Sequence, residues 1–148
     1  MASYEPALLV RDARVRYFAE NGFGDGGYGD RFVVLRVAGV PVAAFPNTRQ
    51  RVRSVRIHDV HHVLTGYDTS WTGEAEIAAW ELASGCRDHW AAWLLNLAAA
   101  AIGVVIAPRA VWCAFARGRR SRNLYGQEWQ DGILDRSVGE LRRELGLA

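Results

Sequence analysis

An uncharged run of eighteen residues, from 90 to 107, sets the strongest limit on the architecture of this chain. A run of this length reaches the lower bound of a membrane-spanning helix, which needs about 17 to 25 apolar residues. Asn96 and Gly103 interrupt its apolar character, and Pro108 and Arg109 end it. In a small helical protein one central helix must be apolar on every side, so we expect 90–107 to be that core helix. The alternatives are a core helix whose outer side rests on lipid, and a true membrane span.

The remaining sequence indicates a mostly α, single-domain helical bundle over residues 1–148, with a small β-hairpin near the N-terminal third. A chain of 148 residues is long enough for one core, and its hydrophobic half with six Trp excludes a disordered chain. The hairpin is expected at 32–37 and 40–45, where β-branched residues flank a Gly turn. A lone hairpin is marginally stable, so it should lie against the helices. Helices are expected at 6–21, from Asn47 or Thr48 to Gly66, at 70–84, at 90–107, at 110–116 and near 127–145, with Trp129 on the inner side of the last.

Composition excludes several classes of protein. All eighteen basic residues are Arg, and the net charge of +2 is too small to argue for a nucleic-acid partner. Cys86 and Cys113 lack the spacing of a metal site and are expected to be reduced thiols in or near the core. The first five residues hold no basic or apolar run typical of a secretion signal. We therefore expect a cytoplasmic protein, with a peripheral position on the inner face of the membrane as the alternative.

The Gly- and Asp-rich segment 22–30 lacks the Lys-Ser/Thr of a phosphate-binding loop and is expected to be a flexible turn.

The segment His58-Asp59-Val60-His61-His62, followed by Glu74, is the strongest candidate for chemistry. At about 100° per residue, positions 58, 59 and 62 share one face of a helix. If the chain turns at Gly66 and the next helix packs antiparallel, Glu74 returns over the His pair. Two His and one carboxylate with room for water are the ligands of a catalytic site for zinc or another divalent metal. Surface or core histidines are the alternative, because this spacing also arises by chance.

Three neighbours of these ligands have less certain roles. Asp59 occupies the position of the Glu general base in zinc proteases, and its shorter reach suits a metal ligand or a residue that orients an imidazole. His61 lies one step round from the ligand face, so it is expected to be no ligand, with an acid or base role as the alternative. Glu81 shares a helix face with Glu74. We expect it to be exposed to solvent, with support of the metal ligands as the alternative.

Two groups of arginines complete the candidate functional residues. Four arginines precede the motif, and we expect them to form a solvated face of the helix: Arg49, Arg51, Arg53 and Arg56. The alternative is an anion site leading to the metal, because Arg binds carboxylate and phosphate bidentately. The segment 117–122 holds four further Arg, which suggest a solvated loop or attraction to anionic lipid, worth about 1 kcal/mol per basic residue. Nucleic-acid binding is the least favoured interpretation, since no aromatic platform or recognition helix accompanies them.

The spacing His58-Asp59-x-x-His62, eleven residues and Glu74 matches the H-D-x-x-H-x11-E signature of the coenzyme Q (ubiquinone) biosynthesis protein 4 family. The chain resembles that family from about residue 14 to residue 148. Further positions that agree are Gly66, Thr69, Gly73, Asn123-Leu124-Tyr125 and Leu141-Arg142-Arg143-Glu144-Leu145-Gly146. The chain departs from the eukaryotic members in its short N-terminal region, in the Gly/Val-rich segment before the motif, and in a spacing from Asn123 to Trp129 that is one residue shorter.

The resemblance implies a metal-dependent enzyme of quinone biosynthesis. The family replaces the C1 carboxyl of prenylated 4-hydroxybenzoate-type rings by hydroxyl, an oxidative decarboxylation. The signature implies four metal ligands, His58, Asp59, His62 and Glu74. His61 and Tyr125 would lie near the reacting groups, with packing as the alternative for Tyr125. Zinc is the expected metal. Two His and a carboxylate also suit iron, and cobalt, manganese or magnesium are further alternatives.

The partners implied are a prenylated aromatic or isoprenoid lipid substrate and other quinone-biosynthesis proteins. An anionic membrane surface and a second copy in a homodimer are further expectations, whereas nucleic acid is not. Two other functions stay open. One is a non-catalytic, prenyl-lipid-binding scaffold for quinone-biosynthesis enzymes, and the other is a metalloenzyme acting on another small acid in a specialised pathway.

Overall fold

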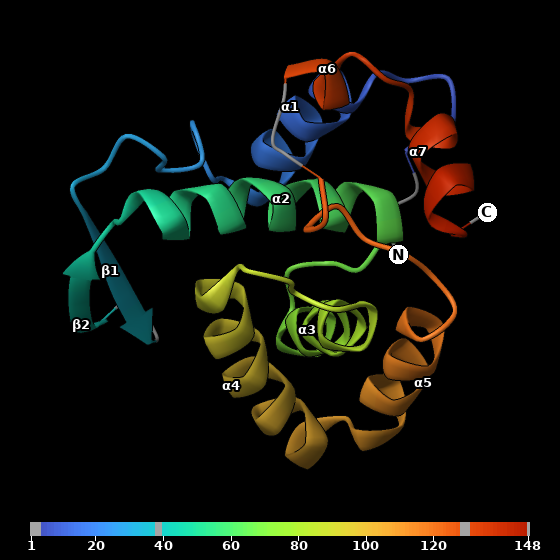
Figure 1. Cartoon of the computed structure of the whole chain (residues 1–148). Helices are drawn as coiled ribbons and strands as arrows, with labels where there is room; N and C mark the ends of the chain where they lie inside the picture. The colour runs from blue at the N-terminus through green and yellow to red at the C-terminus, as the bar shows by residue number, and fades with distance from the viewer. Residues whose placement is uncertain (1–3, 38–39, 128–130, 148) are drawn as a thin grey trace.

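The structure is a computed structural model, and it describes residues 4–37, 40–127 and 131–147. It is mostly helical and contains one small antiparallel sheet, as the sequence predicts (Figure 1). In chain order the elements are α1 (Val10–Asn21), β1 (Phe32–Val37), β2 (Val40–Pro46), α2 (Arg49–Thr65), α3 (Trp71–Ser84), α4 (Trp90–Ile106), α5 (Pro108–Gly118), α6 (Asp131–Leu134) and α7 (Val138–Leu145).

Helix α2 runs through the middle of the molecule, with α1, α6 and α7 on one side and α3, α4 and α5 on the other (Figure 1). Its ends agree with the prediction. The Thr48 side chain accepts a hydrogen bond from the Arg51 backbone N–H, which makes Thr48 the N-cap. Gly66 ends the helix in the left-handed conformation, with φ of 80°, where a residue without Cβ is favoured.

Apolar side chains form a core on each side of α2. On one side Ile57, Val60 and Leu64 of α2 pack with buried residues of α1, α7 and the segment 123–125. On the other side α3 and α5 share a smaller cluster that includes Trp80. The motif helix is therefore anchored in the larger core by one face, which leaves another face for a functional site.

Two arginines hold the C-terminal end of α2. Arg142 of α7 donates from Nε to the Leu64 carbonyl at 2.8 Å, and Arg117 of α5 donates from Nη1 to the Thr65 carbonyl at 3.1 Å. The last carbonyls of a helix lack partners within the helix and carry partial negative charge, so guanidinium groups stabilise this end. Elements from both sides of the molecule thus fix the last turn of α2, directly after His62.

Helix α1 begins at Val10 rather than at residue 6, because the preceding segment pairs with the chain before α7. The Val10 N–H donates to the Arg136 carbonyl and the Val138 N–H donates to the Leu8 carbonyl, both at 2.9 Å. These backbone bonds compete with an additional helical turn.

The single helix predicted near 127–145 is two helices, α6 and α7. Ser137 begins α7 as its N-cap, and Glu140 completes a capping box by accepting from the Ser137 backbone N–H. This start signal lies inside the predicted helix and divides it. Trp129, which was expected on its inner side, lies outside the described residues.

A helix is present within 90–107, as predicted, but the prediction that it is buried in the core is wrong. Helix α4 buries only a narrow stripe of small and polar residues, Ala91, Ala92, Asn96 and Gly103. Its large apolar side chains face solvent, and Leu94 and Val105 are 63% and 82% exposed. The central helix on this side is α3, which lies between α4 and α5 (Figure 1). Within the described ranges, no helix is both long enough and apolar enough to cross a bilayer.

The hairpin is confirmed, with Phe32 opposite Pro46 and an irregularity between Leu35 and Arg36. It lies at the N-terminal end of α2 (Figure 1). The Arg51 guanidinium lies 5.8 Å from the centre of the Phe45 ring and connects the hairpin to that helix. The described apolar side chains Phe32, Val34 and Val40 are exposed, so the expected cover by helices is not seen for them.

Both cysteines are free thiols, as expected. Cys86 is buried in the core, whereas Cys113 is exposed, against the prediction. Helix α5 turns Val111 and Ala114 toward α3, and the neighbouring Cys113 therefore points to solvent.

Candidate metal centre

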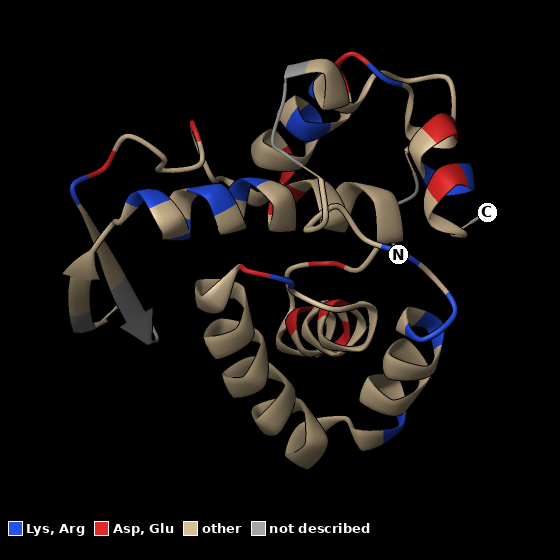
Figure 2. Ribbon diagram, in the orientation of Figure 1, with Lys and Arg blue, Asp and Glu red and all other residues tan. Residues whose placement is uncertain are grey.

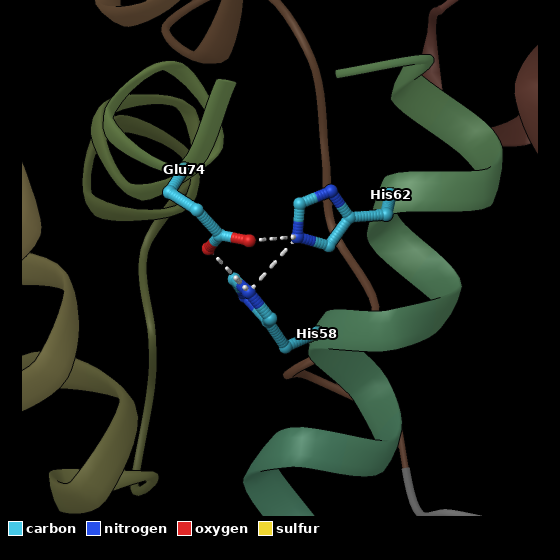
Figure 3. Close-up of side chains that lie close together, drawn as sticks. All are labelled: His58, His62 and Glu74. Atoms are coloured by element: carbon cyan, nitrogen blue, oxygen red, sulfur yellow. Dashed lines mark hydrogen bonds and ion pairs between the residues drawn. The ribbon is translucent and has the colours of Figure 1, made fainter. Parts of the chain in front are cut away.

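Three side chains of the motif converge on one point. His58 and His62 extend from successive turns of α2, and Glu74 extends from the first turn of α3 (Figure 3). The Nε2 atoms of the two histidines are 3.1 Å apart. Glu74 Oε2 lies 3.6 Å from His58 Nε2, and its Oε1 lies 3.5 Å from His62 Nε2. One donor atom from each residue falls within 4.8 Å of the others, so this group could hold a metal ion.

The separations suit a common ion. Two nitrogen donors at about 2.0–2.1 Å from a tetrahedral zinc ion lie about 3.3 Å apart. The donor set of two imidazoles and one carboxylate is also that of catalytic zinc sites with an open position. The predicted convergence of His58, His62 and Glu74 is therefore confirmed, while the identity of the metal is not fixed by these residues.

The second ring nitrogen of each histidine fixes its orientation. His62 Nδ1 donates to the Tyr67 carbonyl at 2.9 Å, and His58 Nδ1 donates to Glu81 Oε1 at 3.0 Å. Because a carbonyl and a carboxylate only accept, we assign a proton to each Nδ1, and both Nε2 atoms face Glu74. Hydrogen bonds of this kind orient the ligand histidines of metal proteins. Burial opposes protonation of His58, but Glu81 and Glu74 raise its pKa well above the usual value. Without an ion its Nε2 therefore also holds a proton, which a bound metal ion would displace.

Glu81 is the centre of the hydrogen-bond network beneath the triad, and the prediction that it is exposed is wrong. Its side chain is fully buried and accepts from His58 and from His61 Nδ1 at 2.6 Å. The Asn96 amide and the Tyr125 hydroxyl donate to its other oxygen at 2.6 and 2.8 Å. Burial opposes ionisation, yet the adjacent His58 and the hydrogen bonds from both histidines lower the pKa of Glu81 well below its usual range.

His61 supports the network and lies outside the triad, as its position on the helix predicts. It is fully buried, its Nδ1 donates to Glu81, and its Nε2 accepts the Leu124 backbone N–H at 3.0 Å. Burial lowers the pKa of His61, which keeps the ring neutral. Both nitrogens are occupied inside the core, so the alternative of an acid or base role does not agree with this arrangement.

Asp59 lies beside the triad and is not one of its three members. The Tyr28 hydroxyl donates to Asp59 Oδ2 at 2.5 Å, and burial raises the pKa of this carboxyl. Tyr67 and Glu81 already fill the ring-orienting positions that Asp59 could have taken. The structure therefore does not group Asp59 with the three candidate ligands: it lines the same cavity and contacts the loop 22–30 through Tyr28.

The triad forms part of the wall of a cavity of about 350 Å³. This size is within the range of small-molecule sites, roughly 300–1,000 Å³. Apolar and aromatic side chains from three parts of the chain complete the wall, among them Tyr17, Phe23, Leu95 and Ala99. Tyr125 also lines it, so both expectations for this residue hold, since it faces the cavity and packs in the core.

The path of α3 differs from the expected antiparallel packing. Figure 1 shows α2 from the side and α3 end on, so the two helices cross steeply. Glu74 still reaches the histidines because it lies in the first turn of α3. Gly73 allows this approach, since a Cβ at this position would lie 2.2 Å from the Asp68 carbonyl oxygen.

Sequence reasoning missed several residues of the site. Asn96 had a usable signal, because a lone amide in an uncharged run implies a buried polar partner. Tyr17, Phe23 and Tyr28 had none, since they reach the site only through the packing of α1 and the loop 22–30 against α2. Tyr17 stacks on the His62 ring with centres 5.4 Å apart.

A scan of protein-family models finds no match to this chain. A search of curated proteins likewise finds no match.

Proposed function

We propose that this chain is a metal-dependent enzyme that acts on an amphipathic aromatic acid. The observation that carries the proposal is the convergence of two imidazole nitrogens and one carboxylate at the wall of a cavity. The resemblance to the coenzyme Q biosynthesis protein 4 family supplies the reaction class, which is oxidative decarboxylation of a prenylated 4-hydroxybenzoate-type ring. The C1 carboxyl leaves as CO2, and a hydroxyl takes its place. Dioxygen is the oxidant: one oxygen atom enters the hydroxyl, and a reductant supplies two electrons that convert the other to water.

In this proposal His58, His62 and Glu74 hold the ion, and Glu81 and the Tyr67 carbonyl hold the two rings in position. A bound divalent ion would supply Lewis-acid or redox chemistry at its open positions. Zinc and iron(II) both suit the donor set. The aromatic walls exclude water and keep the ring of the substrate beside the triad.

The apolar part of the cavity supports a substrate with a hydrocarbon tail. Leu95 and Ala99 of α4 line the cavity, and Leu95 is also 44% exposed on the surface of the molecule. One wall of the cavity is therefore formed by an apolar helix whose outer side is exposed. A prenyl chain attached to the ring can follow this surface while the acidic ring lies at the triad.

The exposed side of α4 and α5 supports a position on an anionic bilayer. Between residues 89 and 127 the chain carries five arginines and no acidic residue. Figure 2 shows α4 without any charge and basic residues at both ends of α5. Large apolar side chains cover the outer surface of both helices, among them Leu97, Val105, Trp112 and Phe115. Apolar groups with Arg and Trp suit a membrane interface, whereas two copies meeting through this surface would bring like charges together.

The 117–122 cluster divides between two roles. Arg117 and Arg122 bind backbone carbonyls of other segments and belong to the fold. Arg119 and Arg120 are exposed and are the residues of this cluster that could meet lipid head groups.

The test of the enzyme proposal begins with metal analysis of the purified protein and mass spectrometry of any lipid that co-purifies. Metal-depleted protein is then reloaded with zinc or iron(II) and incubated with prenylated and unprenylated 4-hydroxybenzoate under air with a reductant. We expect CO2 release and a hydroxylated ring product only after reloading, from a protein that stays folded without metal. No product with either metal, together with unfolding on depletion, would instead support a scaffold with a structural ion.

A further inference from the structure

Arg51 lies on the same face of α2 as the metal ligands. Positions 51, 55, 58 and 62 are separated by three or four residues, and all four line the cavity. His58 follows Arg51 by seven positions, which corresponds to about 10 Å along the helix axis. The cavity therefore has the triad toward one end of this face and Arg51 toward the other.

Arg51 differs from the other arginines at the start of α2. Arg49, Arg53 and Arg56 line a separate surface hollow. Arg49 is exposed, and Arg53 has a carboxylate partner at 3.4 Å. Of these four residues, the structure selects only Arg51 for the cavity of the candidate metal centre.

The guanidinium of Arg51 is incompletely satisfied. Its Nη1 donates to Asn47 Oδ1 at 2.8 Å, and the group lies over the Phe45 ring. Its Nε is buried and has no hydrogen-bond partner within the described part of the chain. Burial lowers the pKa of Arg51, and the negative charge of Asp59 opposes this effect. Arg51 as a whole is partly exposed. An unpaired donor in a partly buried cation is unfavourable, and an anionic oxygen of a ligand that accepts from the rest of the guanidinium would offset this cost.

We infer that Arg51 binds an anionic oxygen of the substrate at the end remote from the triad. This inference rests on the proposed function for the group that lies at the metal. The ligand class is then a rigid ring with an acidic group at each end, one toward His58, His62 and Glu74 and the other on the Arg51 guanidinium. A single benzene ring with para substituents, extended by a metal bond at one end and a hydrogen bond at the other, suits the spacing along α2. Arg51 is a specificity-determining residue in this arrangement.

Two probes that differ only in the second acidic group test this inference. Terephthalate carries carboxylates at both ends of the ring and benzoate at one. Calorimetric titration of the metal-loaded protein is expected to give at least tenfold tighter binding of terephthalate. Arg51→Gln should bring the ratio of the two affinities close to one, while Arg49→Gln, which removes an exposed charge from the same helix, should leave the ratio unchanged.

The affinity ratio separates a binding role from a structural one. A variant with a damaged cavity binds both probes more weakly and keeps the ratio, and this result would overturn the inference. The inference would also be overturned if Arg51→Gln bound both probes with the affinities of the wild-type protein. If Arg51→Gln does not fold, Arg51→Lys keeps a positive charge but loses the planar fork, and it should lower the ratio at least threefold.

Failure of the enzyme proposal leaves a different signature. Metal-depleted wild-type protein should still bind benzoate more tightly than metal-depleted Arg51→Gln, because the guanidinium acts without the ion. Retention of this difference in a protein without turnover would reject the reaction and keep the anion site. Its loss in a protein with turnover would reject the anion site and keep the reaction.

Discussion

At the scale of single residues, the Glu81 carboxylate connects the candidate metal centre to the core. It is fully buried and accepts hydrogen bonds from two histidines of α2, from Asn96 of α4 and from Tyr125. A buried carboxylate is tolerated only when such donors replace water. The orientation of the His58 ring therefore depends on the packing of three other parts of the chain.

Glu81→Gln should weaken both the fold and the metal site. The amide NH2 would face donors that now point at a carboxylate oxygen, and it cannot accept their hydrogen bonds. We expect the free energy of unfolding in urea to fall by about 1–3 kcal/mol. Metal affinity, measured by competition with a chelator, should fall about 10- to 100-fold. Glu76→Gln on the same helix is the control, and equal behaviour of the two variants would contradict the role of Glu81.

His62→Ala should remove most of the bound metal, because it deletes one of only two imidazole donors in the triad. Arg136→Ala is the comparison, since Arg136 forms an ion pair with Glu144 at 2.6 Å and is not among the residues that line the cavity. Metal content per chain is measured by elemental mass spectrometry after identical purification. Equal occupancy in the two variants would reject the assignment of the ligands.

At the scale of elements, the approach of α3 to α2 depends on a close contact at its first turn. The Asp68 backbone folds over Gly73, directly before Glu74, and the Ser70 side chain caps the helix. This contact determines where the third ligand lies. Gly73 therefore serves the geometry of the site as well as the start of the helix.

Gly73→Ala should destabilise the protein, although the same change inside a helix is usually favourable by about 1 kcal/mol. The new Cβ would lie 2.2 Å from the Asp68 carbonyl oxygen, so the loop and Glu74 must move. We expect a lower melting temperature by circular dichroism and a lower metal content. Gly132→Ala in α6 adds a Cβ with no heavy atom within 4 Å, so it should keep or raise the melting temperature and leave the metal content unchanged. A Gly73 variant that melts like this control would show that the contact does not position the third ligand.

At the scale of the whole molecule, the surface is strongly asymmetric. The outer sides of α4 and α5 are apolar and carry only positive charges, while the acidic side chains of the ligand network lie on α3 between them (Figure 2). Exposed apolar surface of this extent on a protein usually marks an interaction site. Leu95 belongs both to the wall of the cavity and to this exposed surface.

The protein should therefore co-sediment with vesicles that contain anionic phosphatidylglycerol, and less so at high salt. Added salt shortens the Debye length from about 10 Å at 0.1 M to about 3 Å at 1 M, which weakens the attraction of Arg119 and Arg120 to the head groups. Leu97→Glu on α4 should reduce vesicle binding, while Val15→Glu on α1, an exposed site of similar character, should not. Salt-independent sedimentation would leave the 117–122 cluster as an ordinary loop. If the protein instead forms dimers in solution and does not bind vesicles, this surface contacts a second copy of the chain.

The local sequence was enough to predict most helix ends and the pairing of the two histidines, whereas the place of Glu74 beside them depends on the packing of α3 against α2. Thr48, Ser70, Gly66 and Gly85 start or end helices through contacts with residues a few positions away, so their signals are present in the sequence itself. The spacing of His58 and His62 places both rings on one face of α2 for the same reason. These features need no knowledge of the rest of the fold.

Burial was decided only by tertiary structure. Glu81 is fully buried and α4 is largely exposed because α3, and not α4, is the helix that the others surround. The sequence does not show which helix lies inside, although one helix holds a charged residue and another is an uncharged run. The position of each helix depends on how all the helices pack against one another. The network beneath the histidines and the selection of Arg51 among four arginines follow from this arrangement, because both depend on which side chains distant parts of the chain enclose.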